Sequence, residues 1–308
     1  MNKKITWLSL LISSFILASC GQKVVEENNE KIQIVATFYP MYEFTKAIVG
    51  EAGDVSLLIP AGTEPHDYEP SAKDVAKMHD ADVVVYNSHV FETWMGNLES
   101  NLDLQKTKII EASQEVELLP IAEADHDHGE EEHDHSEDPH VWLDPILAIK
   151  QVQWIQESLS QQFPEKAAYF IKQSEAYIKE LRAIDEAYQE ALTGAENRSF
   201  VTQHGAFSYL AKRYDLTQEV IAGISSEEEP TPARLAKLKT FVQENQIKVI
   251  YFEENASAKI AQTLAKETGI ELSVLSTIES LTKEQQAASK NYLSIMLDNL
   301  EALKLSIR

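Results

Sequence analysis

The sequence predicts an α/β protein of two lobes, each with a four-stranded, mostly parallel sheet flanked by helices, joined by a long rigid helix. Three observations support this prediction. The chain has 308 residues, more than the roughly 250–300 at which a single hydrophobic core stops growing. Short β-rich runs alternate with helical segments, which is typical of parallel sheets covered by helices. A long helical stretch separates two groups of such runs, one group for each predicted lobe.

Eight β-rich runs define the two predicted sheets. No residue-level repeat relates the two groups of four, so the halves are similar in pattern only. The predicted strands are Ile32 to Thr37, Val55 to Ile59, Asp82 to Tyr86, Lys108 to Ile110, Phe200 to Thr202, Glu219 to Ala222, Lys248 to Phe252 and Leu272 to Leu275.

Several helix starts can be read from capping residues. The sequence predicts two capping boxes and two pairs of an N-cap residue with a following proline. They are Ser71 with Asp74, Thr282 with Gln285, Thr231-Pro232 and Asp144-Pro145.

The linking helix is predicted over residues 164–192. This stretch contains no glycine, and its apolar residues recur at spacings of three, four or seven. At 1.5 Å per residue, such a helix would extend about 40 Å, enough to run the length of two lobes. We therefore expect a stiff body with a cleft between the lobes.

The first 19 residues have the features of a secretory signal peptide. Lys3 and Lys4 precede an apolar run that is too short to cross a bilayer as an ordinary transmembrane helix. The sequence Leu17-Ala18-Ser19-Cys20 resembles the lipobox of bacterial lipoproteins, in which Cys20 becomes the acylated N-terminus; a plain signal peptide with an incidental cysteine is the alternative. We therefore expect a lipid-anchored protein at the extracellular face of the bacterial cell membrane.

Composition argues against a nucleic acid partner and excludes cysteine-based cross-links and metal sites. The chain carries 27 Lys and Arg against 50 Asp and Glu, a formal net charge of −23, so a nucleic acid partner is not expected. Because Cys20 is the single cysteine, an intramolecular disulfide and a cysteine-based metal cluster are both excluded.

An acidic, histidine-rich segment lies between Pro120 and Pro139. It has too few apolar residues to offset the entropy of ordering, so we expect a surface loop. Imidazoles beside carboxylates suit Zn²⁺, and a negative field concentrates cations, so the loop is interpreted as an auxiliary metal-collecting segment; a solvated insertion without function is the alternative. Its histidines are His126, His128, His133 and His135.

The candidates for a tight metal site are side chains that follow the predicted strands. In open α/β sheets, ligands bind outside the carboxyl ends of the strands. His66 and His140 follow strands of the first lobe, and His204 and Glu279 follow strands of the second. A metal held by all four would lie in the cleft. His89 also follows a strand, and its position in the sequence does not exclude it.

Five motifs together resemble the substrate-binding lipoproteins of zinc and manganese ABC importers, closest to the zinc-binding AdcA and ZnuA group. They are the lipobox, Gly62-Thr-Glu-Pro-His-Asp-Tyr-Glu-Pro-Ser with the acidic insert, Asp138-Pro-His-Val-Trp-Leu-Asp-Pro, His204-Gly-Ala-Phe-Ser-Tyr and Glu227-Glu-Glu-Pro-Thr. The resemblance covers the chain from Cys20 to Arg308 and implies a metal in the cleft between two lobes.

The resemblance also implies which residues bind the metal. Matched by position, the ligands are His66, His140, His204 and Glu279, and His89 matches no ligand position. Some zinc receptors of this group carry a further C-terminal metal-binding domain, and we do not expect one here. The fourth ligand is Asp in many relatives and is Glu279 here.

Ligand chemistry favours zinc over manganese. Three imidazoles and one carboxylate suit tetrahedral Zn²⁺, whereas Mn²⁺ prefers more oxygen ligands. The manganese-binding relatives have a glutamate where this chain has His204. Because imidazoles must be neutral to bind metal, we expect the affinity to fall as the pH falls through about 6.5.

The resulting hypothesis is a monomeric receptor that captures extracellular Zn²⁺ and delivers it to an ABC permease and its ATPase. The sequence contains no phosphate-binding Gly-Lys-Ser/Thr motif, so another protein must supply the energy. A zinc hydrolase is not expected, because four protein ligands leave no position for a water. A manganese receptor and an additional role as a surface adhesin are the alternatives.

The predicted boundaries follow from these features. They are a signal peptide at 1–19, a lipidated tether at 20–31, an N-terminal lobe at 32–163 with the histidine-rich loop at 120–139, a linking helix at 164–192 and a C-terminal lobe at 193–308.

Overall fold

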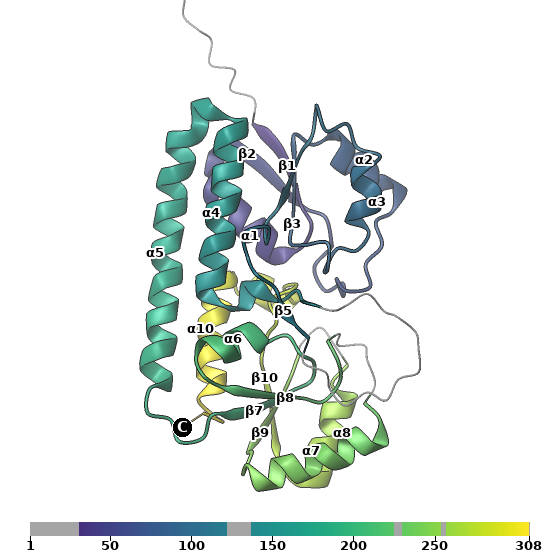
Figure 1. Ribbon diagram of the computed structural model, residues 1–308, viewed down its shortest axis with the longest axis vertical. Coiled ribbons are helices and arrows are strands. Elements are labelled where there is room, and N and C mark those ends of the chain that lie inside the picture. The colour runs from purple at the N-terminus through teal and green to yellow at the C-terminus, as the bar shows by residue number, and fades with distance from the viewer. Residues whose placement is uncertain (1–30, 122–136, 225–229, 254–256, 308) are drawn as a thin grey trace, which may run out of the picture. The chain divides into compact units, whose positions relative to one another are not determined.

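The computed structural model describes residues 31–121, 137–224, 230–253 and 257–307 (Figure 1). Within these ranges the chain forms two lobes, each with a four-stranded parallel sheet, so the predicted fold class is confirmed. No helix among the described residues combines the length and the apolar character that crossing a bilayer requires. The signal peptide, Cys20 and residues 122–136 lie outside the described ranges.

The first sheet has the strand order β2-β1-β3-β4, all parallel. Alternate residues of its strands face opposite sides: Val83 and Val85 join a core with the long helices, whereas Val84 and Tyr86 join a second core with α2 and α3. Both faces are therefore buried, as a parallel sheet requires. The strands are β1 (Ile32–Ala36), β2 (Gly53–Leu57), β3 (Val83–Tyr86) and β4 (Lys108–Glu111).

The second sheet repeats this arrangement with the order β10-β9-β7-β8. Val201 and Ile250 pack on one side with α7 and α8, while Phe200 and Tyr251 pack on the other side in the larger core. The strands are β7 (Ser199–Thr202), β8 (Thr217–Val220), β9 (Val249–Phe252) and β10 (Glu271–Val274).

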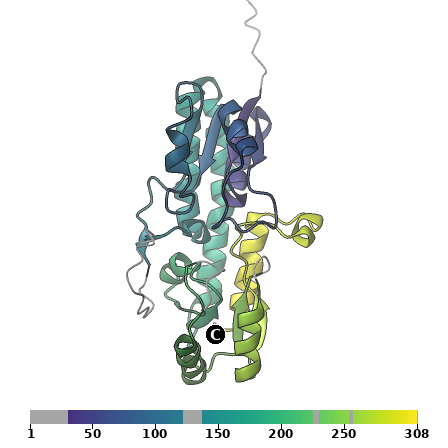
Figure 2. The same cartoon turned by 90° about the vertical axis from the view of Figure 1, so that its right-hand side faces the viewer.

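Most of the helices cover these sheets or link them. Those of the first lobe are α1 (Tyr39–Val49), α2 (Ala72–Asp80) and α3 (Met95–Glu99), and those of the second are α6 (Ser208–Arg213), α7 (Pro232–Glu244), α8 (Lys259–Thr268) and α9 (Lys283–Ala287). The short α9 projects from the side of the second lobe (Figure 2).

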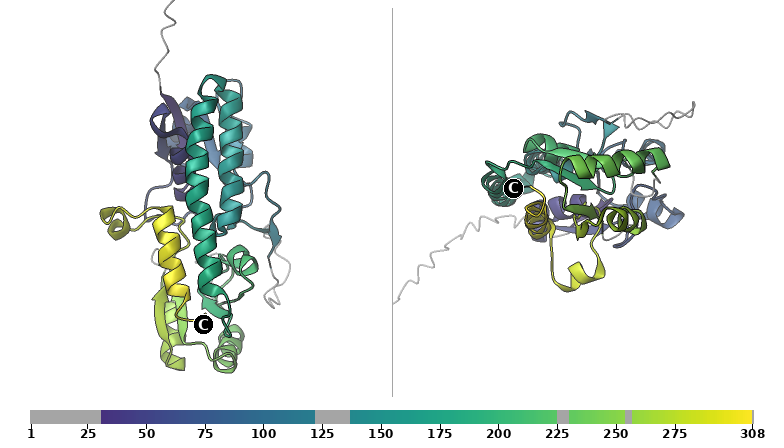
Figure 3. Two further views of the ribbon diagram at one scale, coloured as in Figure 1. Left: turned by 90° about the vertical axis from the view of Figure 1, so that its left-hand side faces the viewer. Right: turned by 90° about the horizontal axis from the view of Figure 1, so that it is seen from below.

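Three helices pack side by side along the lobes, and the longest of them runs along both (Figure 3). Helix α4 (Pro145–Gln162) leads through a short turn into α5 (Ala167–Leu192), and the C-terminal α10 (Tyr292–Leu303) also packs against α5 (Figure 3). One continuous apolar core includes residues of α4, α5, α10 and both sheets. The lobes thus share buried apolar surface as well as the linking helix.

Local signals in the sequence located most elements correctly. The eight predicted strands are present with ends shifted by up to two residues, and both predicted capping boxes form. Thr231 and Asp144 cap their helices as predicted. The sequence analysis missed a two-residue antiparallel pair, β5 (Leu119–Pro120) with β6 (Glu137–Asp138). The predicted domain boundaries stay a prediction.

Candidate metal centre

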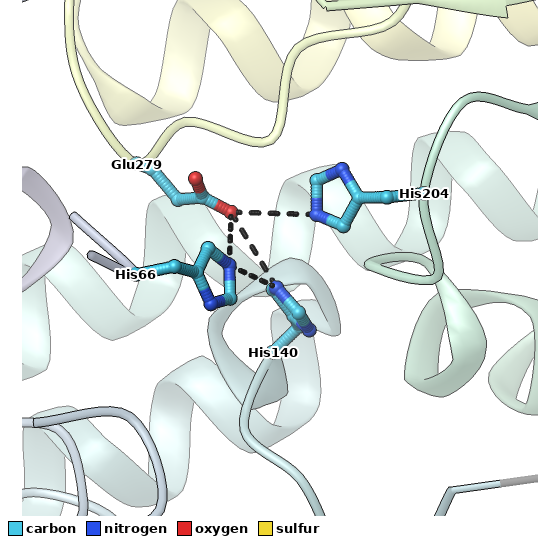
Figure 4. Close-up of side chains that lie close together, drawn as sticks. All are labelled: His66, His140, His204 and Glu279. Carbon is cyan, nitrogen blue, oxygen red and sulfur yellow. Dashed lines mark hydrogen bonds and ion pairs between the residues drawn. The ribbon is translucent and has the colours of Figure 1, made fainter. Parts of the chain in front are cut away.

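Four loops bring the predicted side chains to one point between the lobes. His66 lies in the loop between β2 and α2, and His140 follows β6 at the start of a short 3₁₀ turn. His204 follows β7 by two residues, and Glu279 lies in the segment between β10 and α9. Figure 4 shows the three rings and the carboxylate pointing toward one another.

One ligand atom from each residue lies within 4.8 Å of all the others. The Oε1 atom of Glu279 is 3.6 Å from His66 Nε2, 3.5 Å from His140 Nε2 and 3.8 Å from His204 Nε2. The two Nε2 atoms of His66 and His140 are 3.2 Å apart.

These separations suit a small tetrahedral ion. Zn–N and Zn–O bonds of about 2.0–2.2 Å place tetrahedral ligand atoms about 3.3–3.6 Å from each other. Glu279 Oε1 and His204 Nε2 are buried and have no hydrogen-bond partner among the described residues. A bound cation would satisfy both atoms, so the donor set fits a divalent metal such as Zn²⁺.

The site has little room for anything larger. His140 and His204 are fully buried, Glu279 is 5% exposed and the His66 side chain is 12% exposed. The adjoining cavity, lined by Glu253 and Glu279 among others, has a volume of about 10 Å³. This is about the size of one water-sized sphere.

Two carboxylates contact the far side of two imidazoles. Asp138 Oδ1 lies 2.8 Å from His140 Nδ1, and Glu253 Oε1 lies 2.6 Å from His204 Nδ1. A carboxylate accepts and does not donate, so in the neutral form of both histidines, the form that binds metal, the ring proton belongs on Nδ1 and Nε2 keeps its lone pair toward the centre. We call Asp138 and Glu253 the supporting carboxylates.

The Glu279 segment is held against the first lobe. The indole of Trp142 donates to the carbonyl oxygen of Thr277 at 2.8 Å. Ile278, which lies between Thr277 and Glu279 in the sequence, has a left-handed backbone with φ of 59° and is fully buried. A β-branched residue is strained in this conformation, and such strain persists only where surrounding contacts impose it. The strained residue directly precedes Glu279 and sets the direction from which its side chain enters.

Electrostatic coupling inside the cluster shifts its proton affinities. Burial disfavours the charged form of His140, but Asp138 and Glu279 outweigh it and raise its pKa to about 9. Burial likewise lowers the pKa of His204, yet Glu253 and Glu279 raise it overall. Burial alone would raise the pKa of Glu279, but the surrounding histidines hold it well below 4.5. Without metal, the centre therefore holds protons that a cation must displace.

The other candidate residues lie elsewhere. His89 is half exposed, with Nε2 2.9 Å from Tyr86 Oη, and is not part of the cluster. The predicted loop histidines His126, His128, His133 and His135 lie outside the described residues.

Sequence reasoning missed Glu253 and gave Asp138 no role of its own. Glu253 directly follows β9, so the rule that selected acidic and imidazole side chains at strand ends would have included it. Asp138 lies two residues before His140, a spacing that allows its carboxylate to bond both the amide and the ring of His140.

Comparison with known proteins identifies a matching family. A family model described as "Zinc-uptake complex component A periplasmic" matches residues 34–305. The zinc-binding lipoprotein AdcA of Streptococcus pneumoniae (strain TIGR4) is 50% identical over 305 residues, 98% of this chain and 60% of its own length. The high-affinity zinc uptake system protein ZnuA of Bacillus subtilis is 46% identical over 315 residues, covering 100% of this chain and 99% of its own.

Solved structures have the same fold. The Zn(II)-bound ZnuA-like domain of S. pneumoniae AdcA matches with a TM-score of 0.79 at 49% identity, covering 90% of this chain and 99% of that domain. A second match is the laminin-binding protein Lmb of Streptococcus agalactiae, described as bifunctional with adhesin and metal-transporting activity. Its TM-score is 0.80 at 36% identity, and the match covers 90% of this chain and 99% of that chain. The chain spans 60% of the length of the pneumococcal relative.

Proposed function

Since the chain belongs to the ZnuA family of zinc-uptake components, we propose that it captures Zn²⁺ between its lobes and delivers it to an ABC-type permease. His66, His140, His204 and Glu279 are the proposed ligands. The observation that carries this proposal is that one donor atom from each residue lies within 4.8 Å of the other three, with four of the separations between 3.2 and 3.8 Å, close to those around a tetrahedral ion.

The chemistry of the four proposed ligands favours Zn²⁺ over Mn²⁺ as the bound ion. Three nitrogen atoms and one carboxylate oxygen form a set that tetrahedral Zn²⁺ accepts readily, whereas Mn²⁺ favours more oxygen ligands and binds nitrogen ligands more weakly. The fully buried His204 supplies the third nitrogen. A manganese receptor of the same importer class is the alternative, and direct competition between the two ions distinguishes them.

The proposed role is binding and transfer rather than catalysis. A catalytic zinc keeps one position for water, but the four protein ligands proposed here complete a tetrahedral shell. The cavity of about 10 Å³ beside Glu279 has no room for a substrate together with the ion. Zinc is the cargo, and its uptake depends on the permease and its ATPase.

We further propose that the protein is a monomer held on the outer face of the cell membrane. Residues 1–19 would direct secretion, and lipid chains on Cys20 would anchor the mature protein through the tether at 20–31. The names of the relatives as lipoproteins support this anchoring. The acidic segment would collect zinc for the protein through its histidines, His126, His128, His133 and His135.

Adhesion to laminin is a second candidate function that can coexist with transport. The likeness to the laminin-binding protein of S. agalactiae, at 36% identity, supports it. Binding of the purified chain to immobilised laminin, with and without zinc, tests this role separately from metal capture.

The principal experiment compares His204→Ala with His89→Ala. The purified wild-type protein should contain one zinc per chain by elemental analysis, and His204→Ala should lose most of it. His89 is a matched control, because it is a histidine that follows a strand but lies outside the cluster. Deleting residues 123–137 should lower the affinity far less than His204→Ala. Retention of one tightly bound zinc by His204→Ala would contradict the proposed site.

A further inference from the structure

Two imidazoles of the centre are held in place by carboxylates that do not face the ion. Asp138 and Glu253 are 1% and 6% exposed, and each contacts the Nδ1 atom of one histidine. Isolated buried carboxylates are costly unless nearby groups compensate their charge. Because each of these two carboxylates is buried next to a proposed metal ligand, we ask what they contribute to metal binding.

The position of Glu253 is set by strand register. Strands β7 and β9 are parallel neighbours in which Val201 pairs with Ile250 and Thr202 with Tyr251. Continuing this register by two residues places His204 opposite Glu253. The 2.6 Å contact between His204 Nδ1 and Glu253 Oε1 is thus built on the ends of two central strands.

The position of Asp138 is set by contacts from both lobes. Its Oδ1 accepts hydrogen bonds from the backbone amide and from Nδ1 of His140, at 2.9 and 2.8 Å. Strand β6, which contains Asp138, pairs with β5, and the hydroxyl of Tyr209 in α6 donates to the Asp138 carbonyl oxygen at 2.6 Å. His140 is therefore oriented from the second lobe as well as from its own.

Charge balance gives these carboxylates a second effect. Neutral imidazoles add no charge, so a divalent cation and Glu279 alone would leave one net positive charge in a buried site. Asp138 and Glu253 supply two negative charges next to the rings that bind the cation. Asp138 Oδ2 has no hydrogen-bond partner among the described residues, and the donors to this carboxylate there, the amide and the ring of His140, both bind Oδ1.

We propose that Asp138 and Glu253 are positioning residues that orient His140 and His204 for zinc and increase the affinity of the centre. This inference rests on the proposed function. Hydrogen bonding at Nδ1 keeps the Nε2 lone pair directed at the ion, and the negative charge makes each imidazole a stronger donor. The carboxylate nearest to the ring of His66 in the cluster is the proposed ligand Glu279, whose Oε1 lies 3.6 Å from Nε2, whereas the supporting carboxylates contact Nδ1 of His140 and His204.

Substitutions can separate orientation from charge. Asp138→Asn and Glu253→Gln keep an oxygen that accepts the Nδ1 proton but remove the charge. Asp138→Ala and Glu253→Ala remove both. Asp185→Asn is the matched control, because Asp185 is also a buried carboxylate but bonds Tyr214 and Gln189 in place of a histidine.

The first measurement is the zinc dissociation constant of each full-length variant, determined by competition with a chelator. We expect the two alanine variants to bind zinc about 10–100-fold more weakly, the amide variants to fall between them and wild type, and Asp185→Asn to stay within about twofold. Thermal unfolding of the metal-free proteins establishes that each variant is folded.

The second measurement is the exchange of imidazole N–H protons by ¹⁵N NMR of the zinc-bound proteins. Wild type should show slowly exchanging Nδ1 protons on His140 and His204. Each alanine variant should lose its own protected proton, and the amide variants should keep both. A general loss of stability would not produce this residue-specific pattern.

Three outcomes would overturn the inference. They are unchanged zinc affinity in both alanine variants, unchanged Nδ1 exchange in those variants, or an equal loss of affinity in Asp185→Asn. Failure of the proposed function itself looks different, because wild type would then bind no stoichiometric zinc.

Discussion

The backbone amide of Gly62 donates a hydrogen bond of 2.7 Å to Ser280 Oγ, which ties the loop that carries His66 to the segment that carries Glu279. The two residues are 218 positions apart and belong to opposite lobes. Gly62 has a φ of 79°, a left-handed conformation that favours glycine, so the loop turns sharply at this contact. The two ligands therefore hold each other in place across the cleft.

Loss of this contact should accelerate zinc release. Ser280→Ala removes the acceptor, and a typical net hydrogen-bond contribution of about 0.5–1.5 kcal/mol corresponds to an increase of about two- to tenfold in the dissociation rate. Stopped-flow release into a chelator measures this rate. Ser56→Ala is the control, because its hydroxyl bonds Ile34 within one sheet. Equal rates for wild type and Ser280→Ala would contradict this prediction.

Zinc affinity should depend on pH below about 9. With a pKa raised to about 9, His140 is protonated in the metal-free centre at neutral pH, and zinc must displace that proton. The apparent affinity should fall about tenfold per pH unit for each proton displaced. Calorimetry in buffers of different ionisation enthalpy counts the protons. Affinity that stays constant from pH 9 to 6.5 would exclude this competition.

The stability of the metal-free protein should change in the opposite direction. Because the pKa of His140 is about 9 when folded and about 6.5 when unfolded, its contribution is complete below pH 6.5 and is lost as the pH rises through 9. The unfolding temperature of the metal-free protein should therefore fall between pH 7 and pH 9, and the stabilisation by added zinc should grow. His140→Gln should flatten both trends; an equally steep fall in that variant would assign the effect to another group.

Trp142 should contribute more to stability than Trp154. Trp142→Phe loses the bond from the indole to Thr277 and leaves space in a fully buried position, at a cost of about 2–3 kcal/mol in the free energy of unfolding. The Trp154 indole nitrogen is buried without a hydrogen-bond partner among the described residues, so Trp154→Phe should cost less than about 1 kcal/mol. Chemical denaturation of both variants makes the comparison, and equal costs would remove the special role of the Thr277 contact.

The sequence predicted what local patterns control. Strand runs and caps such as Ser71 with Asp74 depend on neighbouring residues, and both formed as expected. The pair of β5 and β6 was missed because each strand has two residues, and the Tyr209 hydroxyl that bonds both comes from the other lobe. No local signal in the sequence encodes such a contact.

The rule for strand ends selected His66, His140, His204 and Glu279 but left His89 open, and the family resemblance excluded His89; neither predicted the proton affinities. The reference value for histidine placed the pH response near 6.5, whereas the contacts of His140 with Asp138 and Glu279 outweigh the opposing effect of burial and raise its pKa. Such shifts depend on distances of a few ångströms between residues far apart in the chain, and these distances require a structure.

The ring of Trp142 lies against the ring of His140, with centroids 5.1 Å apart. Loading replaces a proton on that imidazole by a metal, which changes the electric field at the indole. The fluorescence of the protein should therefore report occupancy without any added dye. Trp142 thus gives the protein an intrinsic optical sensor, with which the binding and release of zinc by the purified protein can be followed in real time.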